Sequence, residues 1–291
     1  MRPWCPAAPA RSDDRGAFAS GIRRFGAACA VGLSAAASAA EPVVQPPTVS
    51  DLYIVTVNAN LKADPRFPGS DRLTLLGYPS MGLRRADEPQ RFTTPDDGLS
   101  FSFLESPFLR FGVVGRYQSG RYFGDDRRNL FGLREVKWSV EPGAFVEAWP
   151  VEWLRARAAV RYGLHGYEGV VGNFGLDVVQ RFGHFTVSLG PRLAFGDTAF
   201  TSAFFGVTPF EAALNGRVTP FRAMGGVTSA GALGALTYQW SEQWATTVYA
   251  GYDRLVGDAG DSPITRRLGS QDQFTVGARL SYSFAITPFW R

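Results

Sequence analysis

Side chains suited to acid–base or nucleophilic chemistry are few in this sequence. Only two histidines occur, His165 and His184, and a serine nucleophile would need one of them as its base. His165 precedes Glu168 by three residues, and no serine lies near either of them in the sequence. We therefore interpret His165, Tyr167 and Glu168 as a motif that shapes a loop, and we predict no catalytic residues.

Candidate metal ligands are equally sparse. Both cysteines, Cys5 and Cys29, lie within residues 1–40, which leaves two histidines and no thiolate for a transition metal in the rest of the chain. Asp258 and Asp261, together with backbone carbonyls, are a conceivable Ca²⁺ site, but they lack the spacing of an EF-hand loop. We interpret this acidic loop as solvated and predict neither a metal nor a cofactor.

Arginine recurs at alternate positions within apolar segments. Between residues 154 and 162, Arg155, Arg157 and Arg161 alternate with leucine, alanine, valine and tyrosine. Alternation of this kind in a β-strand sends the charged side chains to one face. The same face carries eight arginines and four acids in all: Arg110, Arg116, Arg155, Arg157, Arg161, Arg181, Arg192, Arg279, Glu141, Glu147, Asp177 and Asp253. Unpaired charges in a confined interior are costly, so we expect a network of charge pairs.

The hairpin centred on Val151 allows a specific expectation. Facing residues of paired strands share a side of the sheet, and a short loop at Val151 sets Glu147 opposite Arg155. The same register sets Glu141 opposite Arg161, whereas a shift of two residues either way leaves a carboxylate without a facing arginine. We predict both pairs as structural neighbours that brace the barrel wall.

Period-two alternation continues through most of the chain and predicts twelve strands. They are expected at 51–61, 71–78, 81–93, 98–105, 108–119, 136–148, 152–164, 170–182, 184–195, 225–239, 244–256 and 272–284. An even number suits a single-chain barrel whose two ends lie on the same side of the membrane.

The connections between these segments alternate in length. Tight turns near 105–107, 149–152, 182–184 and 240–243 alternate with long segments at 119–135, 196–224 and 257–270, and tryptophan pairs bracket two of the tight turns. Interfacial aromatics with short turns on one side and long loops on the other are typical of outer-membrane barrels. We therefore predict an all-β fold, a closed antiparallel transmembrane β-barrel with short periplasmic turns and long extracellular loops.

The N-terminal residues have the pattern of a secretory signal peptide. A basic pair, Arg23-Arg24, precedes an apolar stretch at 25–36 and small residues at 37–40. We predict a signal peptide at 1–40, a periplasmic linker at 41–50, the barrel at 51–284 and a C-terminal extension at 285–291. The mature chain is expected to begin at Ala40 or Glu41.

Net charge gives no reason to expect nucleic-acid binding. The chain has 30 basic and 26 acidic residues, of which residues 1–40 hold five and two. The remainder has 25 basic and 24 acidic residues, a net charge of only +1, so the mature chain lacks the excess of positive charge typical of proteins that bind nucleic acid.

One helix is predicted within the long segment 196–224. Thr208 and Glu211 have the spacing of a capping box, and Pro209 suits the first helical position. Glycine is common at the C-cap of a helix, so Gly216 is expected to end this helix. We expect a short helix that begins near Pro209 and ends by Gly216.

Several runs resemble the MipA/OmpV family of outer-membrane proteins. They include Pro68-Gly69-Ser70-Asp71, His165-Gly166-Tyr167-Glu168-Gly169, Phe205-Gly206-Val207-Thr208-Pro209, Tyr252-Asp253-Arg254-Leu255-Val256-Gly257-Asp258-Ala259 and Gly269-Ser270-Gln271-Asp272-Gln273-Phe274. The resemblance implies an outer-membrane barrel in contact with outer-membrane lipid. It also implies a scaffold whose partners are a murein transglycosylase and a peptidoglycan synthase.

Three hypotheses of function follow. The first is a non-enzymatic scaffold in the cell outer membrane, and the second is a narrow channel for small solutes. A single-channel conductance measurement would distinguish the scaffold from the channel. The third and weakest is a lipid-modifying barrel enzyme, which a hydrolase assay with and without His165 would test.

Overall fold

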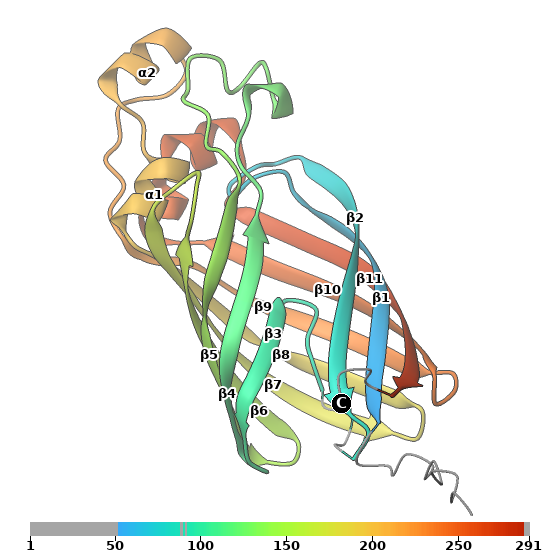
Figure 1. The fold of residues 1–291 in the computed structure, drawn as a ribbon. Helices are drawn as coiled ribbons and strands as arrows, with labels where there is room; N and C mark the ends of the chain where they lie inside the picture. Colours follow the sequence, from blue (N-terminus) through green and yellow to red (C-terminus); the bar gives the residue numbers. More distant parts are fainter. Residues whose placement is uncertain (1–51, 88–89, 91, 288–291) are drawn as a thin grey trace, which may run out of the picture. The chain divides into compact units, whose positions relative to one another are not determined.

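In this computed structural model, which describes residues 52–87, 90 and 92–287, eleven antiparallel strands form one sheet that curls into a nearly closed barrel (Figure 1). The predicted signal peptide and linker lie outside the described residues, and so do residues 288–291. The last strand ends at Ile286, so the first two residues of the predicted C-terminal extension belong to the sheet.

The strands follow one another around the wall in chain order from the third to the eleventh. They are β1 (Tyr53–Pro65), β2 (Leu73–Arg85), β3 (Leu99–Glu105), β4 (Leu109–Gln118), β5 (Ser139–Val151), β6 (Leu154–Gly163), β7 (Gly169–Phe182), β8 (Phe185–Gly196), β9 (Gly226–Gln239), β10 (Trp244–Leu255) and β11 (Asp272–Ile286). Strand β11 then pairs with β1, and β1 pairs with β2, so the sheet order is β2-β1-β11-β10-β9-β8-β7-β6-β5-β4-β3.

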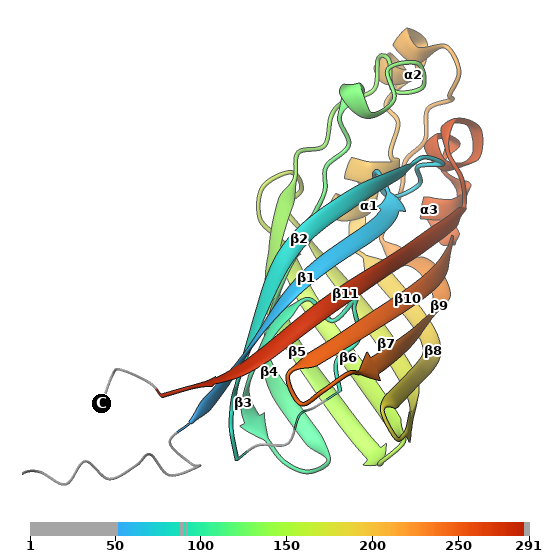
Figure 2. The same ribbon diagram turned by 90° about the vertical axis from the view of Figure 1, so that its right-hand side faces the viewer.

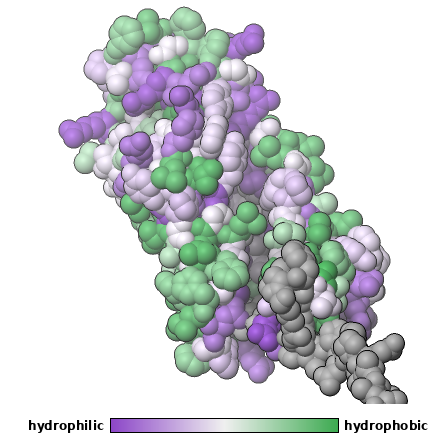
Figure 3. Space-filling model, viewed as in Figure 1, coloured by the Kyte–Doolittle hydropathy of each residue, from purple (hydrophilic) through white to green (hydrophobic). Residues whose placement is uncertain are grey.

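The strands are polar inside and apolar outside. In β6 the arginines at 155, 157 and 161 are buried, whereas Val160 is 59% exposed. In β8 Arg192 is buried while Leu189 is 61% exposed. A soluble sandwich buries its apolar face, so this inverted alternation is the pattern of strands that face lipid. Figure 3 shows hydrophobic side chains spread over the outer face of the strand region in that view.

The predicted all-β antiparallel barrel is confirmed, but the described residues form eleven strands rather than twelve, and the barrel is nearly rather than fully closed. The segments expected at 71–78 and 81–93 are one strand, β2, which pairs with β1 without a break from Leu73 to Arg85. Pro79 lies within it, because an edge strand tolerates a residue that lacks a backbone N–H. An odd number of antiparallel strands leaves the two edge strands parallel to each other, and among the described residues β2 and β3 are not paired with each other.

All helical segments lie at the end of the barrel that carries the long connections (Figure 2). They are the 3-10 turn η2 (Phe123–Asp125), the helices α1 (Thr198–Phe205), α2 (Pro209–Asn215) and α3 (Gly257–Asp261), and the π-helical turn η3 (Ile264–Leu268). No helix among the described residues is long and apolar enough to cross a membrane.

Helices α1 and α3 pack together over the long-loop end. Phe200, Phe204 and Phe205 of α1 form a buried cluster with Tyr167 and Ala259. Four of the five phenylalanines of the segment 196–224 are buried or packed at this end, whereas Phe210 is 72% exposed.

Arg121 binds the C-terminal end of α1. Its guanidinium is buried and donates to the carbonyl oxygens of Phe204 and Arg134. Burial lowers the pKa of Arg121 to about 10, so the side chain stays charged at neutral pH. A cation suits this position because helix C-termini present unpaired carbonyl oxygens.

The predicted helix is confirmed as α2, with its capping box. Thr208 Oγ1 accepts from the backbone N–H of Glu211 at 3.2 Å, and Glu211 accepts from that of Thr208 at 2.7 Å. Gly216 ends the helix with a φ of 70°, which only glycine adopts without strain.

Glu211 also joins α2 to a neighbouring loop. Burial raises the pKa of Glu211, but hydrogen bonds from the backbone N–H groups of Thr208 and Arg134 outweigh it, and the pKa lies below its ordinary value. The ionised Glu211 carboxylate therefore contributes its full stabilisation at pH values above the ordinary pKa of a glutamate. This contribution is lost as the pH falls through the lowered pKa of the folded protein.

We expect Thr208→Ala to loosen α2 without affecting the barrel. Loss of the cap costs about 1 kcal/mol, which corresponds to about fivefold faster hydrogen exchange of the backbone N–H groups in the helix. Hydrogen exchange at the backbone N–H of Glu211 measures it, and Thr219→Ala, an exposed threonine of the same loop, is the control. Unchanged exchange in Thr208→Ala would show that packing alone holds the helix.

Candidate functional site

After β2 the chain leaves the wall, and residues 92–98 lie inside the barrel against the inner faces of β6 and β8. Thr94-Pro95-Asp96-Asp97-Gly98 forms a tight turn, in which the Asp97 carboxylate accepts from the backbone N–H of Thr94 at 2.7 Å and from its hydroxyl at 2.8 Å. Gly98 has a φ of 73°, and a Cβ there would lie 2.9 Å from the carbonyl oxygen of Gly115. Glycine is therefore required where the chain turns back into β3.

Arg155 holds this turn in the lumen. Its Nη2 lies 2.8 Å from both carboxylate oxygens of Asp97, and its Nη1 lies 3.2 Å from Thr94 Oγ1. The same guanidinium contacts Glu147 at 2.7 Å and Asp177 at 3.1 Å. Arg155 is only 1% exposed, so one buried cation joins the inward turn to both neighbouring strands.

The network extends on both sides of Arg155. Arg157 contacts Glu147 at 3.1 Å and Asp97 at 3.3 Å, with its guanidinium 3.8 Å from the Phe145 ring centroid. On the other side, Arg192 lies 2.7 Å from both Asp96 and Asp177. Ion pairs therefore connect the inward turn directly to β6 and β8, and the arginines of these strands extend the connection to β5 and β7.

A fourth arginine connects the network to the first hairpin after the turn. Arg110 of β4 contacts Glu147 at 3.1 Å and Glu105 at 3.3 Å. The Glu147 carboxylate thus contacts arginines from β4 and β6, which explains how it is buried to 1% exposure as an anion.

A second cluster lies nearer the long loops. Glu141 accepts from Arg161 Nε at 3.0 Å and from the Tyr167 hydroxyl, and Arg116 lies 3.9 Å away. Burial and the neighbouring Glu141 carboxylate raise the pKa of Tyr167 well above its ordinary value. Tyr167 therefore stays a hydrogen-bond donor, and it joins the barrel wall to the aromatic cluster of α1.

The predicted register of the hairpin was wrong by two residues. Glu147 faces Arg157, not Arg155, and Gly143 faces Arg161. The two carboxylate–arginine contacts form nevertheless, because long side chains reach diagonal partners across a strand pair. A shift between Ala148 and Val151 near the turn causes the difference, since the sequence argument assumed an undistorted hairpin.

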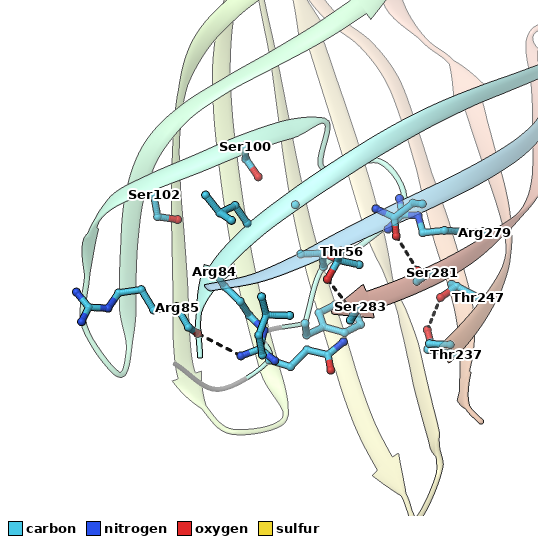
Figure 4. A pocket seen from close by; sticks show the side chains of 18 of the residues that line it. Thr56, Arg84, Arg85, Ser100, Ser102, Thr237, Thr247, Arg279, Ser281 and Ser283 are labelled. Carbon is cyan, nitrogen blue, oxygen red and sulfur yellow. Dashed lines mark hydrogen bonds between the residues drawn. The ribbon is translucent and has the colours of Figure 1, made fainter. Parts of the chain in front are cut away.

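Below the network, toward the short turns, lies a partly open cavity of about 760 Å³ (Figure 4). Arg181 and Arg279, both predicted to point inward, line this cavity. They do not belong to the ion-pair network described above; Arg279 Nε donates to Asn60 at 2.9 Å. The inward arginines thus divide into a paired set at mid-barrel and a second set around the cavity.

The residues of the predicted loop motif do not form one site. His165 adopts a φ of 68°, and its Nδ1 lies 3.0 Å from the carbonyl oxygen of Trp138, while Glu168 is exposed. Within the described residues no hydrogen bond joins His165 to a serine. This contact gives His165 a structural role in shaping its loop.

The two acids of the third long loop have separate partners. Asp258 accepts from the backbone N–H of Met224 at 2.6 Å, and Asp261 pairs with Arg266 at 2.5 Å. Across the described ranges, no group of three or more acidic, histidine or cysteine side chains is arranged to hold a metal ion.

Sequence reasoning missed Asp96 and Asp97, which it placed in the connection before β3. The sequence did indicate that further inward carboxylates were needed, because eight arginines but only four acids were expected to point inward. The excess of cations required further carboxylates, and the turn sequence at 94–98 offers two adjacent ones. The network as built is suited to bracing and blocking a lumen, since each of its buried carboxylates faces at least one guanidinium.

The sequence profile of the family described as MltA-interacting protein MipA matches residues 59–284. This chain belongs to the MipA family. The matched region runs from β1 to β11, so the lumenal network of this MipA-family chain lies wholly within it. No protein with a curated description matches the chain.

Three solved structures are similar to this MipA-family chain at low identity. The KdgM porin is 10% identical with a TM-score of 0.38, over 79% of this chain and 99% of that one. An outer membrane channel from Pseudomonas putida F1 is 10% identical with a TM-score of 0.38, over 84% and 99%. The CymD monoaromatic hydrocarbon channel is 8% identical with a TM-score of 0.33, over 82% and 90%.

We expect Arg155→Met to destabilise the barrel by about 3–5 kcal/mol, because it leaves buried carboxylates without their main cation. Urea unfolding in lipid vesicles measures the loss. Arg116→Met is the matched control, since Arg116 is 43% exposed and 3.9 Å from its partner, and it should cost less than about 1 kcal/mol. Equal losses in the two variants would mean that the network does not hold the lumen together.

Proposed function

We propose that this chain is a non-conducting barrel of the cell outer membrane that acts as a scaffold, without catalysis, for an enzyme that remodels peptidoglycan. The observation that carries the proposal is the inward turn at 92–98, which Arg155, Arg157 and Arg192 hold across the lumen. A barrel whose interior is occupied by a braced segment of its own chain is suited to anchoring and presenting a surface.

The outer face supports a position in a lipid bilayer. Leu75, Phe101 and Leu189 are each more than 60% exposed, and they lie on different strands. A band of this kind around a barrel would be insoluble in water and is stabilised by lipid. Export through a signal peptide, expected from residues 1–40, would direct such a barrel to the outer membrane.

The two ends of the barrel support an orientation. Long connections with packed helices lie at one end, and tight turns lie at the other. Outer-membrane barrels place their short turns in the periplasm. The short-turn end would therefore face the cell wall, where a murein transglycosylase acts, and the family description names such a partner.

A narrow channel is the second candidate, and the cavity near the short turns favours it. The lining of the cavity includes Phe92 and Arg110 but neither Arg155 nor Asp97, whose ion pair holds the inward turn in the lumen. A solute path would require residues 92–98 to leave the lumen, which breaks several buried ion pairs.

We expect no ion current above the lipid baseline when the purified protein is inserted in planar bilayers. The reason is the occupied lumen, and a water-filled porin inserted under the same conditions is the positive control. Steady single-channel steps from the unaltered protein would favour the channel.

We expect the short-turn end to bind the soluble domain of a membrane-bound lytic transglycosylase. Surface plasmon resonance on detergent-purified protein measures this as saturable binding that an unrelated porin of similar size lacks. Hydrolysis of lipid esters that is abolished in His165→Ala would instead support an enzyme, and absence of transglycosylase binding would contradict the scaffold.

A further inference from the structure

One row of side chains runs across five strands on the wall of the cavity. Register pairs Arg181 of β7 with Thr186, Thr186 with Thr237, Thr237 with Thr247, and Thr247 with Arg279 of β11. All five residues line the cavity, and Figure 4 shows Thr237, Thr247 and Arg279 on one wall. Three hydroxyls therefore lie side by side between two guanidinium groups.

The two arginines of this row differ from those of the network above. Within the described residues Arg181 has no ion pair or hydrogen bond, and Arg279 uses only its Nε, toward Asn60. By contrast Arg110, which also lines the cavity, is paired with two carboxylates. The described lining contains five arginines and one acid, Glu105, and the row itself ends in two positive charges, Arg181 and Arg279, that no described carboxylate pairs with.

The remaining lining is rich in groups that both donate and accept. Thr237 and Thr247 share a hydrogen bond of 2.8 Å, and Thr56 and Ser283 share another of 2.8 Å on the adjoining strands. A hydroxyl has one proton to donate and two lone pairs, so each of these pairs keeps spare capacity for a ligand. Phe92, at the end of the inward turn, adds an aromatic surface.

We propose that this cavity binds an oligosaccharide that carries carboxylate groups. Sugar hydroxyls match the row of threonines, and carboxylates match guanidinium groups, which bind them through paired N–H donors. Four strand spacings of about 4.8 Å separate Arg181 from Arg279 along the wall, about 19 Å in all. This spacing suits an extended ligand with more than one carboxylate rather than a single small anion.

Access from the periplasm rests on the proposed orientation. Peptide-free murein glycan has the required chemistry, because a muramic acid unit without its stem peptide bears a free lactyl carboxylate. Binding itself depends neither on a transglycosylase nor on the absence of ion current. The two proposals can therefore fail separately.

Isothermal titration of the detergent-purified protein with a peptide-free murein tetrasaccharide, whose two muramic acid units give it two carboxylates, tests the site. We expect saturable binding, and neutral chitotetraose should bind at least about tenfold more weakly. Arg181→Gln and Arg279→Gln should each weaken tetrasaccharide binding about tenfold, whereas Arg266→Gln, an exposed arginine of η3, should leave it unchanged.

Retained heat-modifiable migration on gels verifies that each variant is folded, and Arg279→Lys, which keeps the charge, should recover part of the affinity. Equal binding of the neutral and charged tetrasaccharides would overturn the role of the arginines. Full displacement by an equal concentration of inorganic phosphate would overturn the carbohydrate assignment, and unchanged affinity in both glutamine variants would overturn the site.

Discussion

Arg155 is the residue on which the interior of this barrel depends. Its guanidinium contacts Glu147, Asp177 and Asp97, which come from two strands of the wall and from the inward turn. A buried carboxylate without a cation is strongly unfavourable, and among the described residues Arg155 is the one cation that contacts all three of these acids. The cation therefore fixes both the spacing of the wall and the position of residues 92–98.

The inward turn follows the strand at which the closure of the sheet is incomplete. Eleven antiparallel strands leave β2 and β3 running in the same direction, so among the described strands these two cannot complete the antiparallel ladder. The chain must travel the length of the missing strand between Arg85 and Leu99, and part of it does so within the lumen. The inward turn thus takes the topological place of a twelfth strand and supplies the acids that the inward arginines lack.

Distinct layers follow along the barrel axis. Aromatic residues of α1, packed against Ala259 of α3, close the long-loop end, the ion pairs around Arg155 occupy the middle, and a hydroxyl- and arginine-lined cavity remains toward the short turns. The polar interior is thus divided between an ion-paired region, which is held by buried guanidinium groups, and a cavity lined by hydroxyls and arginines.

The sequence alone determined the family, the alternation of lipid-facing and inward residues, and the helix at 209–215, because each depends on local spacing. It also identified most of the inward arginines, since parity within a strand assigns a side chain to a face. The register at Glu147 depended on a distortion of the hairpin that parity does not reveal. The role of Asp97 was decided only by the tertiary structure, because its partner Arg155 lies 58 residues away and no local pattern records a segment that enters the lumen.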